Sequence, residues 1–100
     1  MHTIRLSAAW EHPAGEGVSL RRFHTPTGLI EGDRVWLLLG GEGRLTELRL
    51  NAVELDATAV ERRWEIAHLL RQGGINELHF ASDAPKAVAA GALLQIEPAG

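Results

Sequence analysis

The stretch that decides the fold is residues 45–80, LTELRLNAVELDATAVERRWEIAHLLRQGGINELHF. Residues 45–50 alternate between apolar and polar side chains with a period of two, which is typical of a half-buried strand. Asn51-Ala52 interrupts the alternation, and Asn tolerates the left-handed conformation that a tight turn often needs. We therefore predict a hairpin whose return strand is short and covers residues 53–55.

The second half of the stretch has two readings. Trp64 and Ile66 alternate with charged neighbours as in a strand, and Leu78 and Phe80 share a face after the breaker Gly73-Gly74. Helical periodicity instead favours one helix over residues 58–72. That helix would start with a capping box, in which Thr58 and Glu61 each satisfy a backbone N–H. It would place four residues on one face: Val60, Trp64, Ala67 and His68. On periodicity alone, residues 58–72 fit a helix slightly better than a strand, and strand-plus-turn remains the alternative.

A resemblance favours the strand. Residues 17–80 resemble the amino-terminal jelly-roll domain of family 2 glycoside hydrolases, the β-galactosidase and β-glucuronidase group. The matching segments follow the family order, and they are Arg21-Arg22-Phe23, Pro26, Gly32-Asp33-Arg34, Val35 to Leu39, Leu48 to Ala52, Trp64 to Ala67, Leu69-Leu70 and Gly74 to Leu78. The resemblance implies an all-β, antiparallel β-sandwich of galactose-binding-like jelly-roll type, with Leu69-Leu70 on one helical turn. We expect seven to eight strands in a single domain, residues 1–100.

Two departures from the family pattern bear on function. Ala52 stands where the family usually has Gly, and segment 56–62 lacks the His-Gly-Gly-aromatic loop that reaches the enzymes' active site. The catalytic carboxylates of those enzymes lie in a separate barrel domain, which a chain of 100 residues is too short to contain. The resemblance therefore implies a non-catalytic module, and we expect no enzymatic activity.

The remaining strands are read from shorter patterns. They are expected at residues 2–10, 18–24, 34–39 and 93–96, with the run at 34–39 central and covered on both faces. A loop is expected at 11–17 from the breakers Pro13, Gly15 and Gly17. Residues 86–91 fit either a helical turn or a strand end. The expected core residues are Trp36, Leu38, Leu48, Leu50, Trp64, Ile66, Leu78 and Phe80.

Composition excludes several classes of function. A net charge of −3 gives no basic face for nucleic acid, and the absence of cysteine removes disulfides, thiolate nucleophiles and cysteine metal sites. No apolar run is long enough for a signal peptide or a membrane span, so the default expectation is a cytoplasmic protein without membrane contact. The five histidines form no short-spaced pair, no loop is rich enough in Asp for calcium, and the serines lack a nucleophile elbow. We therefore expect neither a metal nor another cofactor.

Sugar binding needs an exposed aromatic ring and polar side chains for the hydroxyl groups. Trp36, Trp64 and the two phenylalanines are expected in the core, which leaves Trp10 beside the loop residue His12 as the candidate platform. The competing interpretation, which the sequence favours, is that Trp10 only covers the edge of the sandwich. Asn51 and Asn76 are interpreted as structural turn residues that bond nearby backbone.

Two hypotheses for the function remain at this point. The first, implied by the resemblance, is a non-catalytic carbohydrate-binding module with Trp10 and His12 as its ligand-binding residues. The second is a protein-interaction or scaffold domain that kept the fold without a sugar site. The candidate partners are accordingly a carbohydrate or another protein.

Overall fold

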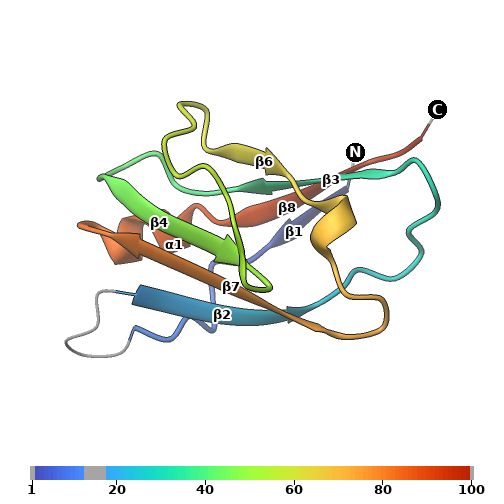
Figure 1. The fold of residues 1–100 in the computed structure, drawn as a ribbon, viewed down its shortest axis with the longest axis horizontal. Helices are drawn as coiled ribbons and strands as arrows, with labels where there is room; N and C mark the ends of the chain where they lie inside the picture. Colours follow the sequence, from blue (N-terminus) through green and yellow to red (C-terminus); the bar gives the residue numbers. More distant parts are fainter. Residues whose placement is uncertain (1, 13–17, 100) are drawn as a thin grey trace.

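The computed structural model describes residues 2–12 and 18–99, which form two four-stranded antiparallel sheets packed face to face (Figure 1). The strands are β1 His2–Arg5, β2 Val18–His24, β3 Arg34–Leu38, β4 Leu45–Leu50, β5 Val53–Glu54, β6 Arg63–Glu65, β7 Ile75–Ser82 and β8 Leu93–Glu97. A 3-10 turn, η1 Ala67–Leu69, and a short helix, α1 Pro85–Ala90, complete the elements. The predicted all-β sandwich is confirmed, with eight strands.

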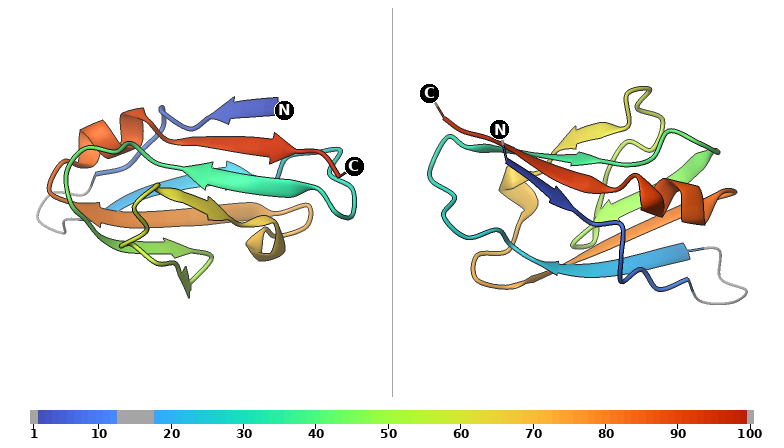
Figure 2. Two further views of the ribbon diagram at one scale, coloured as in Figure 1. Left: turned by 90° about the horizontal axis from the view of Figure 1, so that it is seen from above. Right: turned by 180° about the vertical axis from the view of Figure 1, so that it is seen from behind.

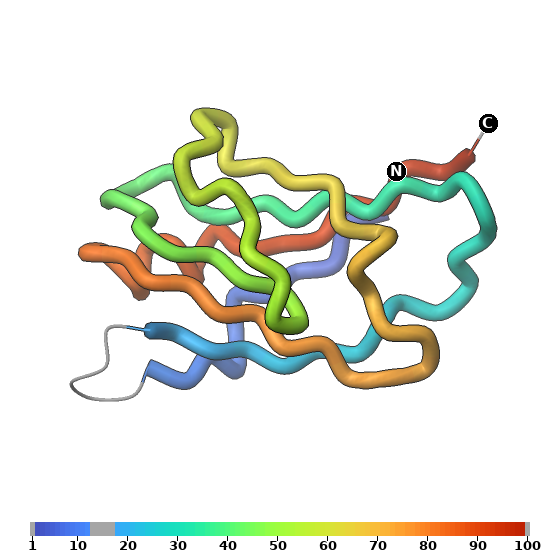
Figure 3. The backbone as a smooth tube through the Cα atoms, viewed as in Figure 1, coloured from blue at the N-terminus to red at the C-terminus, as the bar shows by residue number. Residues whose placement is uncertain are grey.

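The strand order shows how the chain reaches this shape. One sheet has the order β1-β8-β3-β6 and the other β2-β7-β4-β5, so the pairs 1–8, 2–7, 3–6 and 4–5 are all hydrogen-bonded. This is one long hairpin rolled up so that successive pairs alternate between the two sheets, which is the plan of a jelly roll. The two ends of the chain, β1 and β8, consequently run side by side (Figure 3).

The tip of this long hairpin is the predicted Asn51-Ala52 turn. Both residues have positive φ, 52° and 67°, as the central positions of the tightest hairpin turns require. Leu50 then pairs with Val53 and Arg49 with Glu54. Ala52 therefore occupies a left-handed position without glycine, at a cost of about 1–2 kcal/mol.

A helix over residues 58–72 is wrong, and the strand-plus-turn alternative is right. Arg62 has a φ of 51°, which a right-handed helix cannot accommodate. The Thr58 backbone N–H and hydroxyl bond Asp56 Oδ1 at 2.9 and 2.5 Å instead of starting a helix. The segment then pairs with β3 as β6, and Ile66 N–H donates to Val35 O at 2.8 Å.

Six of the eight expected core residues are buried, and two are not. Leu48, Leu50, Trp64, Ile66, Leu78 and Phe80 are at most 8% exposed. Trp36 and Leu38 are only half-buried, because they point away from the opposite sheet, while Val35, Leu37 and Leu39 point into the core. The expectation that residues 34–39 are covered on both faces is likewise wrong within the described chain. The error lies in which residues of the strand are expected to face inward. An uninterrupted apolar run has no alternation of apolar and polar residues that would identify the inward face.

Other boundaries also shift. The strand expected at residues 2–10 ends at Arg5, and the chain turns at Ala9, whose φ is 64°. Residues 86–91 take the helical alternative, with α1 placing buried Val88 and Ala89 at one end of the sandwich. Pro13, Gly15 and Gly17, the breakers of the expected loop, lie outside the described residues.

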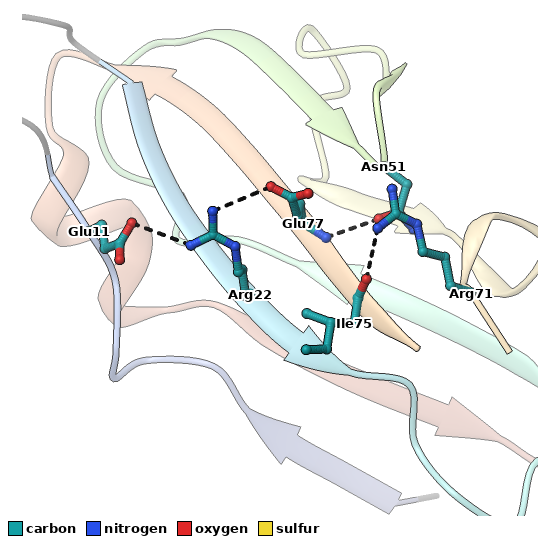
Figure 4. Close-up of polar contacts among 6 residues, drawn as sticks. All are labelled: Glu11, Arg22, Asn51, Arg71, Ile75 and Glu77. Atoms are coloured by element: carbon teal, nitrogen blue, oxygen red, sulfur yellow. Dashed lines mark hydrogen bonds and ion pairs between the residues drawn. The ribbon is translucent and has the colours of Figure 1, made fainter. Parts of the chain in front are cut away.

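The opposite end of the sandwich is tied by a buried amide network. The Asn76 side chain is fully buried on β7, where its amide donates to Phe23 O and Thr25 Oγ, and its oxygen accepts from Asn51 Nδ2 and Arg71 N. Asn51 Oδ1 in turn accepts from Glu77 N at 2.9 Å (Figure 4). Both asparagines are structural, but Asn76 connects distant segments from within a strand and does not sit in a turn.

Candidate functional site

Trp10 and His12, the residues predicted to bind a ligand, line one hollow on the surface. Its other lining residues come from the segment after β1 and from α1, and the volume is about 310 Å³. We call it the Trp10 hollow; it is lined by Ser7, Ala9, Trp10, His12, Lys86, Ala89 and Ala90. Volumes of this size are at the lower end of those that hold small ligands.

The backbone and two contacts fix the indole of Trp10. Left-handed Ala9 turns the chain immediately before it, and Trp10 Nε1 donates back to Leu6 O at 2.5 Å. The ring meets Phe80 edge to face, with centroids 5.0 Å apart and an interplanar angle of 71°. Trp10 is half-buried, so it covers the core with one part of its surface and lines the hollow with another.

His12 is exposed, and its ring is held by a contact with a buried serine. Its Nδ1 lies 2.7 Å from the hydroxyl of Ser19, a residue that is only 2% exposed. Nε2 makes no hydrogen bond to any described residue. The contact therefore presets the orientation of the imidazole.

Two further residues of the hollow were missed by sequence reasoning. Ser7 and Lys86 are exposed and line the same hollow as Trp10, although Lys86 is distant in sequence. Lys86 reaches the hollow because α1 follows β7, which lies between β2 and β4. The only sequence signal was that Lys86 is the sole lysine of the chain.

Neither of the other tryptophans offers a free ring in a hollow. Trp64 is 8% exposed and donates from Nε1 to Asp56 O at 2.9 Å, as expected of a core residue. Trp36 lies on the outer side of β3, where the Arg63 guanidinium carbon sits 3.6 Å from the ring centroid. Its Nε1 donates to Glu97 Oε2 at 3.0 Å.

A larger hollow, of about 550 Å³, lies at the other end of the sandwich. It is lined by the loop after β2 and by the segment around η1, with His68, Glu31 and Gln72 among its polar residues, and its lining contains no Trp, Tyr or Phe. Asp33 also lines it, but its carboxylate accepts hydrogen bonds from the N–H groups of Ile30 and Ala99, which lower its pKa. This hollow therefore lacks the broad apolar ring of a tryptophan and has one of its carboxylates engaged within the fold.

The described residues contain no group of three or more His, Asp or Glu side chains placed to hold a metal ion. In the same part of the chain, neither helical segment has the length and apolar character needed to cross a membrane.

Comparisons of the chain with models of protein families, with curated proteins and with solved structures returned no match.

Proposed function

We propose that the domain is a non-catalytic carbohydrate-binding module whose ligand lies in the Trp10 hollow. The observation that carries the proposal is the composition of this hollow. Trp10 lines this hollow, whereas no Trp, Tyr or Phe lines the larger hollow at the other end of the sandwich. Aromatic surface beside a few well-placed polar groups is the usual composition of a small-ligand site.

Each side chain of the hollow has a role in this proposal. The exposed part of the Trp10 ring provides an apolar surface for the C–H face of a pyranose. The Ser7 hydroxyl, His12 Nε2 and the Lys86 ammonium provide hydrogen-bonding groups for sugar hydroxyls, and Lys86 also suits a uronate carboxylate. Because Leu6 O and Phe80 hold the Trp10 ring and Ser19 holds the His12 ring, little side-chain freedom is lost on binding.

The same lining argues for binding without catalysis. Glycosidases place two carboxyl groups across the scissile bond. The hollow is lined by one lysine, one histidine and one serine as its polar residues, and no carboxylate belongs to its described lining. The order of segments that resembles the family 2 glycoside hydrolase domain, together with the sandwich fold, supports the same class of function.

The expected affinity is modest. A single hexose has about 12 non-hydrogen atoms, and about 0.3 kcal/mol for each gives about 4 kcal/mol, which corresponds to a Kd near 1 mM. An oligosaccharide that extends beyond the hollow would bind more tightly.

The test is a titration with β-galactosides, β-glucuronides and their oligosaccharides, followed by tryptophan fluorescence and calorimetry. We expect saturable binding that Trp10→Ala reduces at least tenfold and that Trp36→Phe, a matched change outside the hollow, leaves intact. A glycan array without any bound sugar, or binding that Trp10→Ala does not change, would overturn the proposal. The alternative of a protein-interaction domain has its own supporting observation, a group of half-buried apolar side chains on the outer face of one sheet.

A further inference from the structure

The outer side of the β1-β8-β3-β6 sheet carries an unusual set of residues. Trp36, Leu38 and Leu93 are half-buried at its centre, with charged and polar residues around them. We call this surface the Trp36 face; it comprises Thr3, Arg5, Arg34, Trp36, Leu38, Arg63, Glu65, Leu93, Gln95 and Glu97. In the left view of Figure 2 the four strands lie side by side in front of the other sheet.

This face differs from the outer face of the other sheet. There the arginines are neutralised within the chain: Arg22 lies 3.8 Å from Glu11 and 3.7 Å from Glu77 (Figure 4), and Arg49 lies 2.9 Å from Glu47. On the Trp36 face, Arg5, Arg34 and Arg63 form no ion pair with any described residue.

The two glutamates of the Trp36 face each use only Oε2 for contacts with described residues, so that Oε1 of Glu65 can meet another group. Glu97 accepts from Trp36 Nε1, and Glu65 accepts from Ala67 N at 2.7 Å and lies 3.7 Å from His68 Nδ1. The face thus combines half-buried apolar side chains with three arginines that lack an ion pair with the described residues, one of which, Arg63, stacks on the Trp36 ring. Solvent-facing sides of antiparallel sheets are normally polar, so these features indicate a surface that is covered in the working protein.

Strand register arranges the face in two neighbouring rows. One row reads Arg5, Leu93, Leu38, Arg63 across β1, β8, β3 and β6. The adjacent row, two residues along each strand, reads Thr3, Gln95, Trp36, Glu65 across the same strands.

We propose that a second copy of this chain covers the Trp36 face through a two-fold axis that runs across the strands between these two rows. Such an axis places each row on the other row of the partner copy, strand over the same strand. Arg63 then faces Glu65 of the other copy, and Leu38 faces Trp36 of the other copy, each contact occurring twice. At these two positions the surface is self-complementary in charge and in apolar character, as an isologous interface requires, and the other two positions bring Leu93 to Gln95 and Arg5 to Thr3.

The size of the face sets the strength of the dimer. Four strands spaced about 4.8 Å apart and about five residues long cover roughly 300 Å² in projection. Stable interfaces bury about 800 Å² on each partner. This area is well below that of a stable interface, so we expect dimers only at high protein concentration, with the ion pairs deciding their register more than their affinity.

Charge reversal gives a direct test by analytical ultracentrifugation between about 10 µM and 1 mM. A copy carrying Arg63→Glu presents two carboxylates at the contact, and a copy carrying Glu65→Arg presents two guanidinium groups. We expect each variant alone to dimerise at least about tenfold more weakly than the unchanged chain, because both ion pairs become repulsive. An equimolar mixture of the two variants should recover dimerisation, because each supplies the charge that the other lacks.

The matched control reverses a pair on the opposite sheet, Arg22→Glu and Glu77→Arg, and should leave the dimer unchanged. Concentration-dependent NMR shifts of the unchanged chain give a second readout that needs no variant, and the Trp36 indole N–H signal should move with dilution. A chain that stays monomeric at 1 mM, or a mixture that does not recover, would overturn the proposal. Glycan titrations report on the Trp10 hollow separately, so failure of one proposal does not imply failure of the other.

Discussion

Trp64 is the side chain whose removal tests the packing of the sandwich most severely. It lies on β6, is 8% exposed, and belongs to the buried cluster that includes Leu48, Leu50 and Phe80. Trp64→Ala removes the transfer energy of a buried indole and leaves a cavity, which costs about 3–5 kcal/mol. Its hydrogen bond to Asp56 O adds little, because Asp56 is exposed and water can replace the donor.

Trp10→Ala is the matched comparison. Trp10 is half-buried, so less apolar surface is lost, and its edge-to-face contact with Phe80 contributes about 0.5–1.5 kcal/mol beyond burial. We expect a cost of about 2–3 kcal/mol for this variant.

Urea unfolding followed by far-ultraviolet circular dichroism separates the two variants. For a slope of about 1–1.5 kcal/mol/M, Trp64→Ala should lower the midpoint by about 2–5 M, and Trp10→Ala by about 1.3–3 M. Since domains of this size have only about 5–15 kcal/mol of stability, Trp64→Ala is also the variant more prone to fail to fold. If Trp10→Ala proves the more damaging change, the assignment of core and hollow is inverted, and Trp64 becomes the residue to test for ligand binding.

Three further changes probe single features. Asn76→Ala should cost about 2–4 kcal/mol in thermal or urea unfolding, because it leaves several buried amide partners unsatisfied, and an unchanged midpoint would show that the network is not stabilising. Ala52→Gly should raise the free energy of unfolding by about 0.5–1 kcal/mol, since it relieves a left-handed alanine, and a loss of stability would contradict the turn. The pKa values of Asp33 and Asp56 are lowered by hydrogen bonds, so their stabilisation is present above the unfolded pKa of about 3.9 and is lost as pH falls through the folded values. Unfolding midpoints measured from pH 6 to 2.5 should therefore fall more for the unchanged chain than for the variant carrying Asp33→Asn and Asp56→Asn, and parallel curves would refute the linkage.

Local pattern predicted those parts of the fold where alternation or a turn signal is visible. Residues 45–50 alternate clearly, and Asn51 marks the tip of the long hairpin. The helical periodicity of residues 58–72 gives a wrong prediction because it carries no information on the backbone conformation of Arg62. That left-handed backbone is stabilised by pairing with β3 and by hydrogen bonds from the Arg62 guanidinium to the Gly40 and Glu42 carbonyls. Tertiary contacts outweigh local propensity there.

The candidate site depends on long-range pairing that periodicity does not encode. Trp36 was placed in the core because residues 35–39 are apolar on both sides, and only the register with β8 and β6 decides which of them point outward. Lys86 lines the same hollow as Trp10 only because β7, the strand before α1, pairs with β2. A single sequence could therefore indicate Trp10 and His12, but not the other residues of the hollow.

The central proposal, a sugar on Trp10, is tested most directly by the indole N–H signals in an NMR titration with glycans. The three tryptophans occupy three different places: Trp10 in the hollow, Trp36 on the outer sheet face and Trp64 in the core. The proposal predicts that a bound galactoside or glucuronide shifts the Trp10 signal in a saturable way and leaves the Trp64 signal in place. Saturable shifts confined to Trp36, or no shift of the Trp10 signal with any glycan, would contradict it.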